Sequence, residues 1–283
     1  MVAPAVTILI LLCCFFETGY AQVQVSPTRV MLGMHDCSEQ VNVLNSTFET
    51  VEITVGLDFR LIRSDSNGRI SISATVNDVE RERSCAEWLK IFPRRFSLAP
   101  GESRSVRILA IPPASIEGGE YWGRLIVGSV PVSLRPAAAD VSQAIETKLT
   151  MRIELDIPIV FRKGNVETGI EFQAISASTN SVGTVVLVDL HRLGNSAYRG
   201  TLNAMLSAAD GTEIIRLGEQ FTAEFGLRKA LRFPVLSAGR YSLKLESVTV
   251  KKAGANDAVI NAPTVWRVYD FDVATSGIQI SSR

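Results

Sequence analysis

Few side chains in this chain of 283 residues could do chemistry. His35 and His191 are its two histidines, and they fall in different halves of the sequence. A three-histidine zinc or copper site cannot be built from them, and no HExxH, CxxC or GxSxG pattern occurs. No glycine-rich loop leads into Lys-Ser or Lys-Thr, which argues against nucleotide binding. The sequence therefore predicts a protein that is not an enzyme and uses no cofactor or metal, with a hydrolase as a distant alternative.

The N-terminal residues indicate export. Residues 6–16 form an apolar run too short to span a bilayer, and the small residues Gly19 and Ala21 follow it. This pattern predicts a signal peptide over residues 1–21 that is removed from the mature chain. Cys37 and Cys85 remain after cleavage, and an even pair in an exported chain predicts a disulfide between them. Two buried thiols are the alternative.

The most regular pattern of the chain lies at residues 148–162 (KLTMRIELDIPIVFR). Its apolar residues alternate at period two, which predicts a β-strand. At roughly 3.3 Å per residue the strand would be about 50 Å long, further than one small sandwich needs. Another protein can pair with a long strand that carries one apolar ridge. The ridge consists of Leu149, Met151, Ile153, Leu155, Ile157, Ile159 and Phe161.

The rest of the chain also has the pattern of β-structure. Residues 51–59 alternate between apolar and polar, and Asn67-Gly68 and Pro100-Gly101 mark turns. Short strands punctuated by turns are typical of a β-sandwich, and the length allows two domains with a core each. We therefore expect an all-β fold of two tandem sandwich domains, residues 22–163 and 164–283.

Four short motifs stand in the first predicted domain: SPTRV at residues 26–30, VNVLN at 41–45, FPRRFSLAPGES at 92–103 and GEY at 119–121. In order and spacing they resemble the PapD-like periplasmic chaperones of pilus and fimbria assembly. The second domain matches more loosely, as in a less typical branch of that family. The resemblance implies two immunoglobulin-like domains set at an angle, and a periplasmic location.

The resemblance also implies a function, which is to capture pilus or fimbrial subunits that lack their last strand and to hold them folded until assembly. Such a subunit exposes a hydrophobic groove and unpaired backbone groups, which invite aggregation. A chaperone strand laid into the groove supplies ladder hydrogen bonds and alternate apolar side chains, which is donor-strand complementation. The predicted donor residues are Leu149, Met151, Ile153 and Leu155. The alternative is that this ridge belongs to the core of the first domain.

Members of that family hold the client's terminal carboxylate with two basic residues, and the resemblance implies that Arg29 is the first. A guanidinium suits this role because it can donate two parallel hydrogen bonds to a carboxylate. The second should lie on the long strand, but Pro158 or a near neighbour stands at the matching position. Arg152 and Lys148 are the nearest basic residues of the strand, and Arg152 is the predicted second anchor. An exposed strand arginine is the alternative for Arg29.

The implied partners are pilus or fimbrial subunits, with an outer-membrane usher as a further candidate. The formal net charge of zero gives no support for binding nucleic acid, and we expect no membrane insertion after signal cleavage. An unoccupied apolar strand edge favours aggregation, so a self-capping homodimer could shield it. The rival function is an exported, non-catalytic β-sandwich protein that contacts other envelope proteins without donating a strand.

Overall fold

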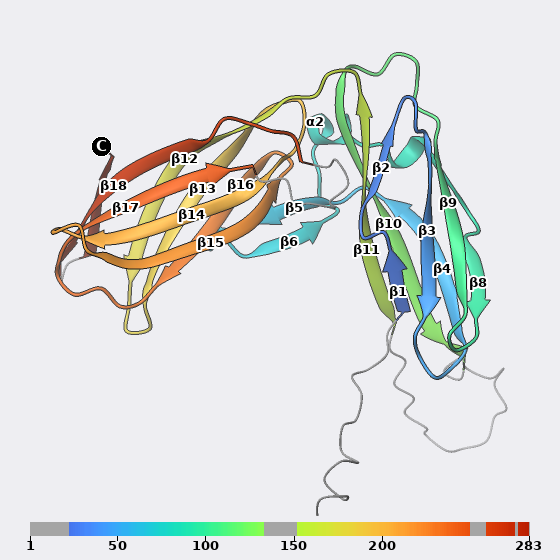
Figure 1. Ribbon diagram of the computed structural model, residues 1–283, viewed down its shortest axis with the longest axis horizontal. Helices are drawn as coiled ribbons and strands as arrows, with labels where there is room; N and C mark the ends of the chain where they lie inside the picture. Colours follow the sequence, from blue (N-terminus) through green and yellow to red (C-terminus); the bar gives the residue numbers. More distant parts are fainter. Residues whose placement is uncertain (1–22, 133–151, 250–258, 275–276, 283) are drawn as a thin grey trace, which may run out of the picture.

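The computed structural model describes residues 23–132, 152–249, 259–274 and 277–282. Its regular structure is nearly all β, as the sequence predicts, and it forms two β-sandwiches that lie at an angle to each other (Figure 1). Within these ranges, no helix has the length and apolar character that crossing a membrane requires.

The first sandwich packs a four-stranded sheet, in the order β1-β3-β9-β7, against a five-stranded sheet, in the order β2-β11-β10-β4-β8. A short 3-10 helix, η2, leads into β7. The elements are β1 (Val23–Ser26), β2 (Val30–Gly33), β3 (Ser38–Asn45), β4 (Val51–Asp58), η2 (Ala86–Trp88), β7 (Leu89–Phe92), β8 (Arg95–Leu98), β9 (Ser103–Ala110), β10 (Gly119–Pro131) and β11 (Ile153–Lys163).

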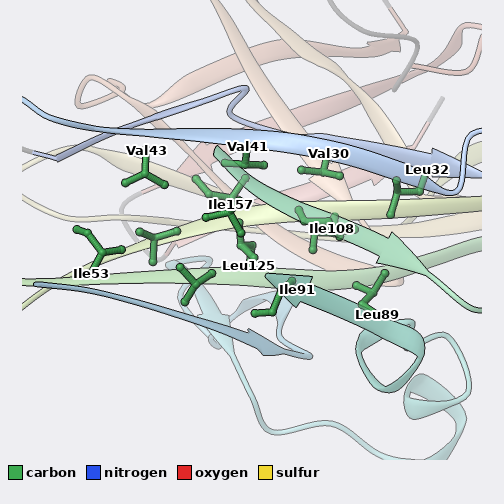
Figure 2. Close-up of a cluster of buried hydrophobic side chains, with 14 of the residues drawn as sticks. Val30, Leu32, Val41, Val43, Ile53, Leu89, Ile91, Ile108, Leu125 and Ile157 are labelled. Atoms are coloured by element: carbon green, nitrogen blue, oxygen red, sulfur yellow. The ribbon is translucent and has the colours of Figure 1, made fainter. Parts of the chain in front are cut away.

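Alternate residues of these strands fill the core of the first sandwich (Figure 2). Val41 and Ile108 from one sheet and Ile53 and Leu125 from the other have no exposed surface. The alternation predicted at residues 51–59 is confirmed over β4, because one face of that strand meets the opposite sheet. Burying each such aliphatic side chain contributes about 1.5–3 kcal/mol.

The second sandwich packs a three-stranded sheet, β12-β13-β16, against a five-stranded sheet, β15-β14-β17-β18-β19. Its largest fully buried side chains are Tyr198, Phe271, Ile170 and Leu190. The strands are β12 (Thr168–Thr179), β13 (Thr184–Gly194), β14 (Tyr198–Ala208), β15 (Glu213–Ala223), β16 (Gly226–Phe233), β17 (Gly239–Val248), β18 (Val265–Ala274) and β19 (Gly277–Ser282).

A hairpin from the first half of the chain, β5 (Leu61–Ser64) and β6 (Ile70–Ser73), lies against the second sandwich, and the short helix α2 (Asp78–Arg81) follows it (Figure 1). The backbone N–H of Ile62 donates to Glu224 Oε2 at 2.7 Å. The backbone N–H of Arg228 donates to Ser64 Oγ at 2.7 Å. The hairpin therefore connects the first half of the chain to the second sandwich through hydrogen bonds between backbone N–H groups and side-chain oxygens.

The N-terminal segment changes sheets at the junction of the two sandwiches. β1 pairs antiparallel with β3 in one sheet, whereas β2 pairs parallel with β11 in the other. The chain crosses between the two sheets from Ser26 to Val30. Arg29, the last residue before β2, is thereby placed beside Pro158 in the middle of β11, at the junction of the sandwiches.

Candidate functional site

Strand β11 has a backbone edge that is only partly covered. On one side it pairs with β10 along its whole length, from Ile153 to Lys163. On the other side β2 pairs with it only from Ile159 to Arg162. Within the described part of the chain, no strand covers that second side over residues 153–158. Among the described residues, the backbone groups of this stretch thus have no strand partner on that side.

The two halves of the apolar ridge predicted along this strand differ in burial. Ile159 and Phe161 are fully buried and Ile157 is 7% exposed, and all three belong to the core of the first sandwich. The core interpretation is therefore correct for the second half of the ridge. Val160 faces the opposite way and is also buried, beside Trp122 at the junction of the sandwiches. Beyond Pro158 the strand is thus buried on both faces.

The first half of the ridge is less enclosed. Ile153 is half-buried and lies outside the core cluster, whereas Leu155 is half-buried and packs against it. Leu149 and Met151, the other two predicted donor residues, lie outside the described residues. A donor role for these four side chains stays a prediction.

The structure does not bring the two predicted anchors together. Val30, which follows Arg29, is aligned with Ile159 of β11. Arg152 directly precedes β11 and lies seven residues before Ile159, a separation of about 23 Å at 3.3 Å per residue of extended chain. Its side chain is 57% exposed and forms an ion pair with Glu154 at 3.2 Å. Arg152 therefore cannot share one carboxylate with Arg29.

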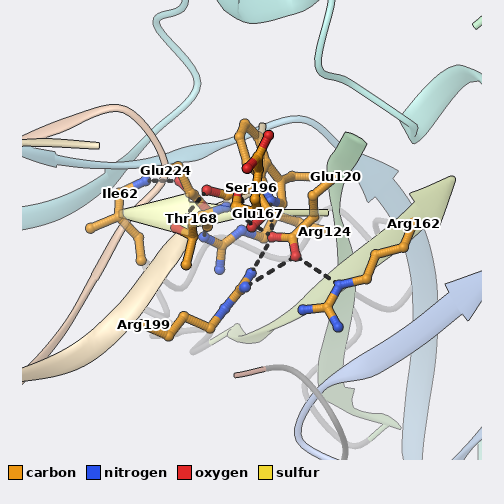
Figure 3. Close-up of polar contacts among 11 residues, drawn as sticks. Ile62, Glu120, Arg124, Arg162, Glu167, Thr168, Ser196, Arg199 and Glu224 are labelled. Carbon is orange, nitrogen blue, oxygen red and sulfur yellow. Dashed lines mark hydrogen bonds and ion pairs between the residues drawn. The ribbon is translucent and has the colours of Figure 1, made fainter. Parts of the chain in front are cut away.

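A buried ion-pair network joins the two sandwiches at this junction (Figure 3). Glu120 of β10 has no exposed surface, and its carboxylate accepts hydrogen bonds from Arg199 Nη2 at 2.7 Å and Arg162 Nε at 3.0 Å. Trp122 Nε1 donates a further bond at 2.7 Å. Burial alone would raise the pKa of the Glu120 carboxyl, but these cations and donors outweigh it and hold the pKa below its usual value. Glu120 is therefore ionised and holds Arg199 of β14 against the first sandwich.

A second ion pair crosses the junction, with the arginine on the first sandwich and the acid on the second. Arg124 of β10 lies 3.4 Å from Glu224, and within its own sandwich it also pairs with Asp156 of β11 at 3.2 Å. Glu224 is buried, and burial raises the pKa of its carboxyl although the charge of Arg124 and the N–H of Ile62 partly offset the effect. Each sandwich thus supplies one buried acid and one buried arginine to the other, which fixes how they meet.

Arg29 lies beside this network, and none of the ion pairs found among the described residues includes it. Its Nε is buried and has no hydrogen-bond partner among the described residues. Burial and the charge of Arg199 lower the pKa of the Arg29 guanidinium, and Glu120 only partly compensates. Arg29, Pro158 and Arg199 line one small cavity, so the open edge of β11 ends where Arg29 stands. This site can bind an anion.

Cys37 and Cys85 are free thiols in the structure, so the predicted disulfide is not formed in it. Cys85 is fully buried in the core of the first sandwich, where its Sγ faces Gly123 of β10, and Cys37 packs against the same core. Burial raises the pKa of the Cys85 thiol, which therefore stays protonated. No group of three or more His, Cys, Asp and Glu side chains in the described ranges could hold a metal ion.

The sequence interpretation missed Glu120, Arg124 and Arg199 as members of a site. Glu120 falls inside the GEY motif, and Arg124 follows within a run of apolar residues. A charged residue within an apolar strand is a signal for a buried ion pair, because a buried charge requires a partner. The partners themselves could not be identified, since Arg199 is 79 residues from Glu120 and Glu224 is 100 residues from Arg124.

Comparison with protein-family models and with curated proteins finds no match. Solved structures do match. The YadV chaperone has a TM-score of 0.46 and 11% identity, covering 87% of this chain and 98% of that one. The CsuC-CsuE chaperone–tip adhesion subunit complex of Acinetobacter baumannii has a TM-score of 0.45 and 12% identity, and the match covers 87% of this chain and 98% of that one. The Pseudomonas aeruginosa CupB2 chaperone has a TM-score of 0.43 and 15% identity, and the match covers 86% of this chain and 98% of that one. Each of these three structures contains a chaperone.

Proposed function

We propose that this chain is a periplasmic chaperone that binds pilus or fimbrial subunits through strand β11 and delivers them for assembly. The observation that carries the proposal is the uncovered edge of residues 153–158, which begins at a half-buried isoleucine. A client that lacks one strand can add its own edge here, gaining backbone hydrogen bonds and contacts with Ile153 and Leu155. No catalytic group or cofactor is required, because folding of the client supplies the free energy.

The position of Arg29 sets the direction of the client strand. Arg29 and Pro158 line the same cavity, at the end of the uncovered stretch. A client whose terminal carboxylate binds Arg29 must place its C-terminus beside Pro158. Its last strand would then run parallel to β11, with earlier residues of the client beside Ile153. Arg152 lies at the opposite end of this stretch and takes no part in holding the carboxylate.

The edge of β11 could also be occupied by a second copy of the chain, as a self-capping homodimer, before the client arrives. A client and a second copy would compete for the same backbone groups, so capture requires the dimer to dissociate. Delivery to an outer-membrane usher would follow capture. The location that suits this function is the periplasm, with residues 1–21 removed.

The decisive experiment replaces Ile153 with Asp and measures client capture. The variant and the wild-type protein, each tagged at the C-terminus, are recovered from the periplasm of the natural host and studied by native mass spectrometry. We expect a one-to-one complex with an exported β-subunit for the wild-type protein and none for the variant. Since Ile153 is only half-buried and lies outside the core cluster, the variant should lose about 1 kcal/mol of stability or less.

Ile214→Asp is the matched control, because Ile214 is 41% exposed on β15 of the second sandwich, far from β11. It should keep the client complex. If Ile153→Asp folds and still captures the client, strand donation by β11 is wrong. If the wild-type protein has no partner at all, the rival function of a non-chaperone envelope module is supported instead.

A further inference from the structure

A second, larger cavity opens beside Arg29, and the β5–β6 hairpin and the second sandwich form its walls. Its volume is about 500 Å³, within the range of small-molecule sites. Ile62 and Ile70 of the hairpin and Phe221 of β15 give it an apolar wall. Arg29 and Arg199 line it as well, and the same two arginines line the small cavity at Pro158. The two cavities therefore adjoin each other at the end of the open edge of β11.

The charges around this cavity leave one cation unbalanced. Arg199 is held by Glu120 at 2.7 Å, and Arg124 is held by Glu224 and Asp156. Arg29 forms no ion pair with the acids of this network, and its buried Nε has no hydrogen-bond partner among the described residues. An anion placed against Arg29 would satisfy that donor and gain from a second positive charge on Arg199.

The other wall of the cavity favours apolar contact. Phe221 is 7% exposed and Ile62 packs against the core of the second sandwich, so both are held in place. Ile70 is 43% exposed and leaves part of its surface available to a ligand. A group bound here would therefore meet positive charge at one end and aliphatic and aromatic carbon at the other.

We propose that this cavity selects a carboxylate attached to an apolar side chain, namely the C-terminal residue of the client. The proposal rests on the proposed function and deepens it, because it adds a requirement for the side chain of the terminal residue. Arg29 holds the carboxylate, Arg199 strengthens the positive field, and Ile62, Ile70 and Phe221 contact the side chain. The hairpin of the first half of the chain thus becomes part of the recognition site.

The test uses small probes of the terminal residue with the full mature chain. N-acetyl-leucine, N-acetyl-leucinamide, N-acetylglycine and octanoate are titrated, and binding is followed by NMR chemical shifts. We expect N-acetyl-leucine to bind at least about tenfold more tightly than its amide, since one charge-assisted hydrogen bond is worth that ratio or more. N-acetylglycine should bind more weakly than N-acetyl-leucine because it lacks the apolar side chain. Tighter binding of octanoate than of N-acetyl-leucine would indicate a lipid-derived acid and overturn the choice of a peptide terminus.

Two variants localise the binding. Arg29→Ala should weaken N-acetyl-leucine binding about tenfold or more. Ile70→Ser should weaken it several-fold, and Ile72→Ser is its matched control, because Ile72 is 47% exposed on the same strand and does not line the cavity. Equal effects of the two serine variants, or equal binding of the acid and the amide, would overturn the inference.

The failure of this inference can be told apart from failure of the proposed function. If Ile70→Ser and wild-type protein capture the client with equal affinity while Ile153→Asp captures none, the chaperone function stands and the side-chain pocket is wrong. If N-acetyl-leucine binds as expected but no client is captured by the wild-type protein, the cavity is a carboxylate site and the chaperone function is wrong.

Discussion

Replacing Glu120 with Gln removes the charge at the centre of the junction while keeping the size of the side chain. In the wild-type chain its two oxygens accept bonds from Arg199 at 2.7 Å, Arg162 at 3.0 Å and Trp122 at 2.7 Å. A glutamine has a single acceptor oxygen and would turn an amide N–H₂ toward an arginine. At least one guanidinium therefore loses its bond to this fully buried carboxylate.

The expected loss of stability follows from the burial of both partners. The side chain of Glu120 has no exposed surface and that of Arg199 is 8% exposed, so the pair has little access to solvent. Removing one partner of a buried ion pair costs about 3–5 kcal/mol, because the other charge stays buried without compensation. Domain stabilities are typically about 5–15 kcal/mol, so this loss should be a large part of the total.

Urea unfolding followed by circular dichroism measures this effect, and small-angle X-ray scattering of the native variant tests the angle between the sandwiches. Glu213→Gln is the control, since Glu213 also pairs with an arginine at 2.7 Å but on the surface, where both side chains are exposed. That control should unfold like the wild-type protein. A loss of less than about 1 kcal/mol for Glu120→Gln, within the range of exposed pairs, would refute the reasoning that this network holds the sandwiches together.

Two further outcomes are expected. Because the pKa of the Glu120 carboxyl lies below its unfolded value of 4.5, its stabilisation is complete above that pH and is lost as the pH falls through the lowered pKa. The urea midpoint of the wild-type protein should therefore fall more steeply below pH 4.5 than that of Glu120→Gln, and parallel curves would contradict this. Gly68→Ala should loosen the β5–β6 hairpin, because φ is +73° there and a Cβ would lie 2.7 Å from the backbone nitrogen of Ala230. Hydrogen exchange over residues 61–73 should speed up in that variant and stay unchanged in Gly101→Ala, which has the same φ of +73° but no atom within 4 Å of the added Cβ.

The chain's local patterns determined much of its secondary structure. The alternation over residues 51–59 and 148–162 predicted two strands. β4 lies in the first range, and β11 begins at Ile153 in the second, of which residues 148–151 lie outside the described residues. Such patterns are local, because a strand with one buried face must place apolar side chains at every second position whatever covers that face. The motifs of the first domain likewise predicted the all-β fold. They also implied Arg29 as an anchor for a carboxylate, which stays a prediction. The structure places Arg29 in a small cavity with Pro158 and Arg199.

Periodicity could not tell which half of the long ridge would be covered. Ile157, Ile159 and Phe161 look like Ile153 and Leu155 in the sequence, yet only the first three are buried. The difference arises because β2 pairs with β11 only beyond Pro158, where the opposite sheet and the second sandwich also pack. Coverage of a strand depends on segments distant in the sequence, and a local pattern carries no information about them.

The junction of the sandwiches was decided by tertiary structure alone. Glu120 meets Arg162 across 42 residues and Arg199 across 79, and the hairpin reaches Glu224 across 162. Each of these charged side chains, taken alone in the sequence, gives no indication of its partner. Their pairing, the unbalanced charge of Arg29 and the apolar wall beside it exist only because folding brings these distant segments to the place where the two sandwiches meet.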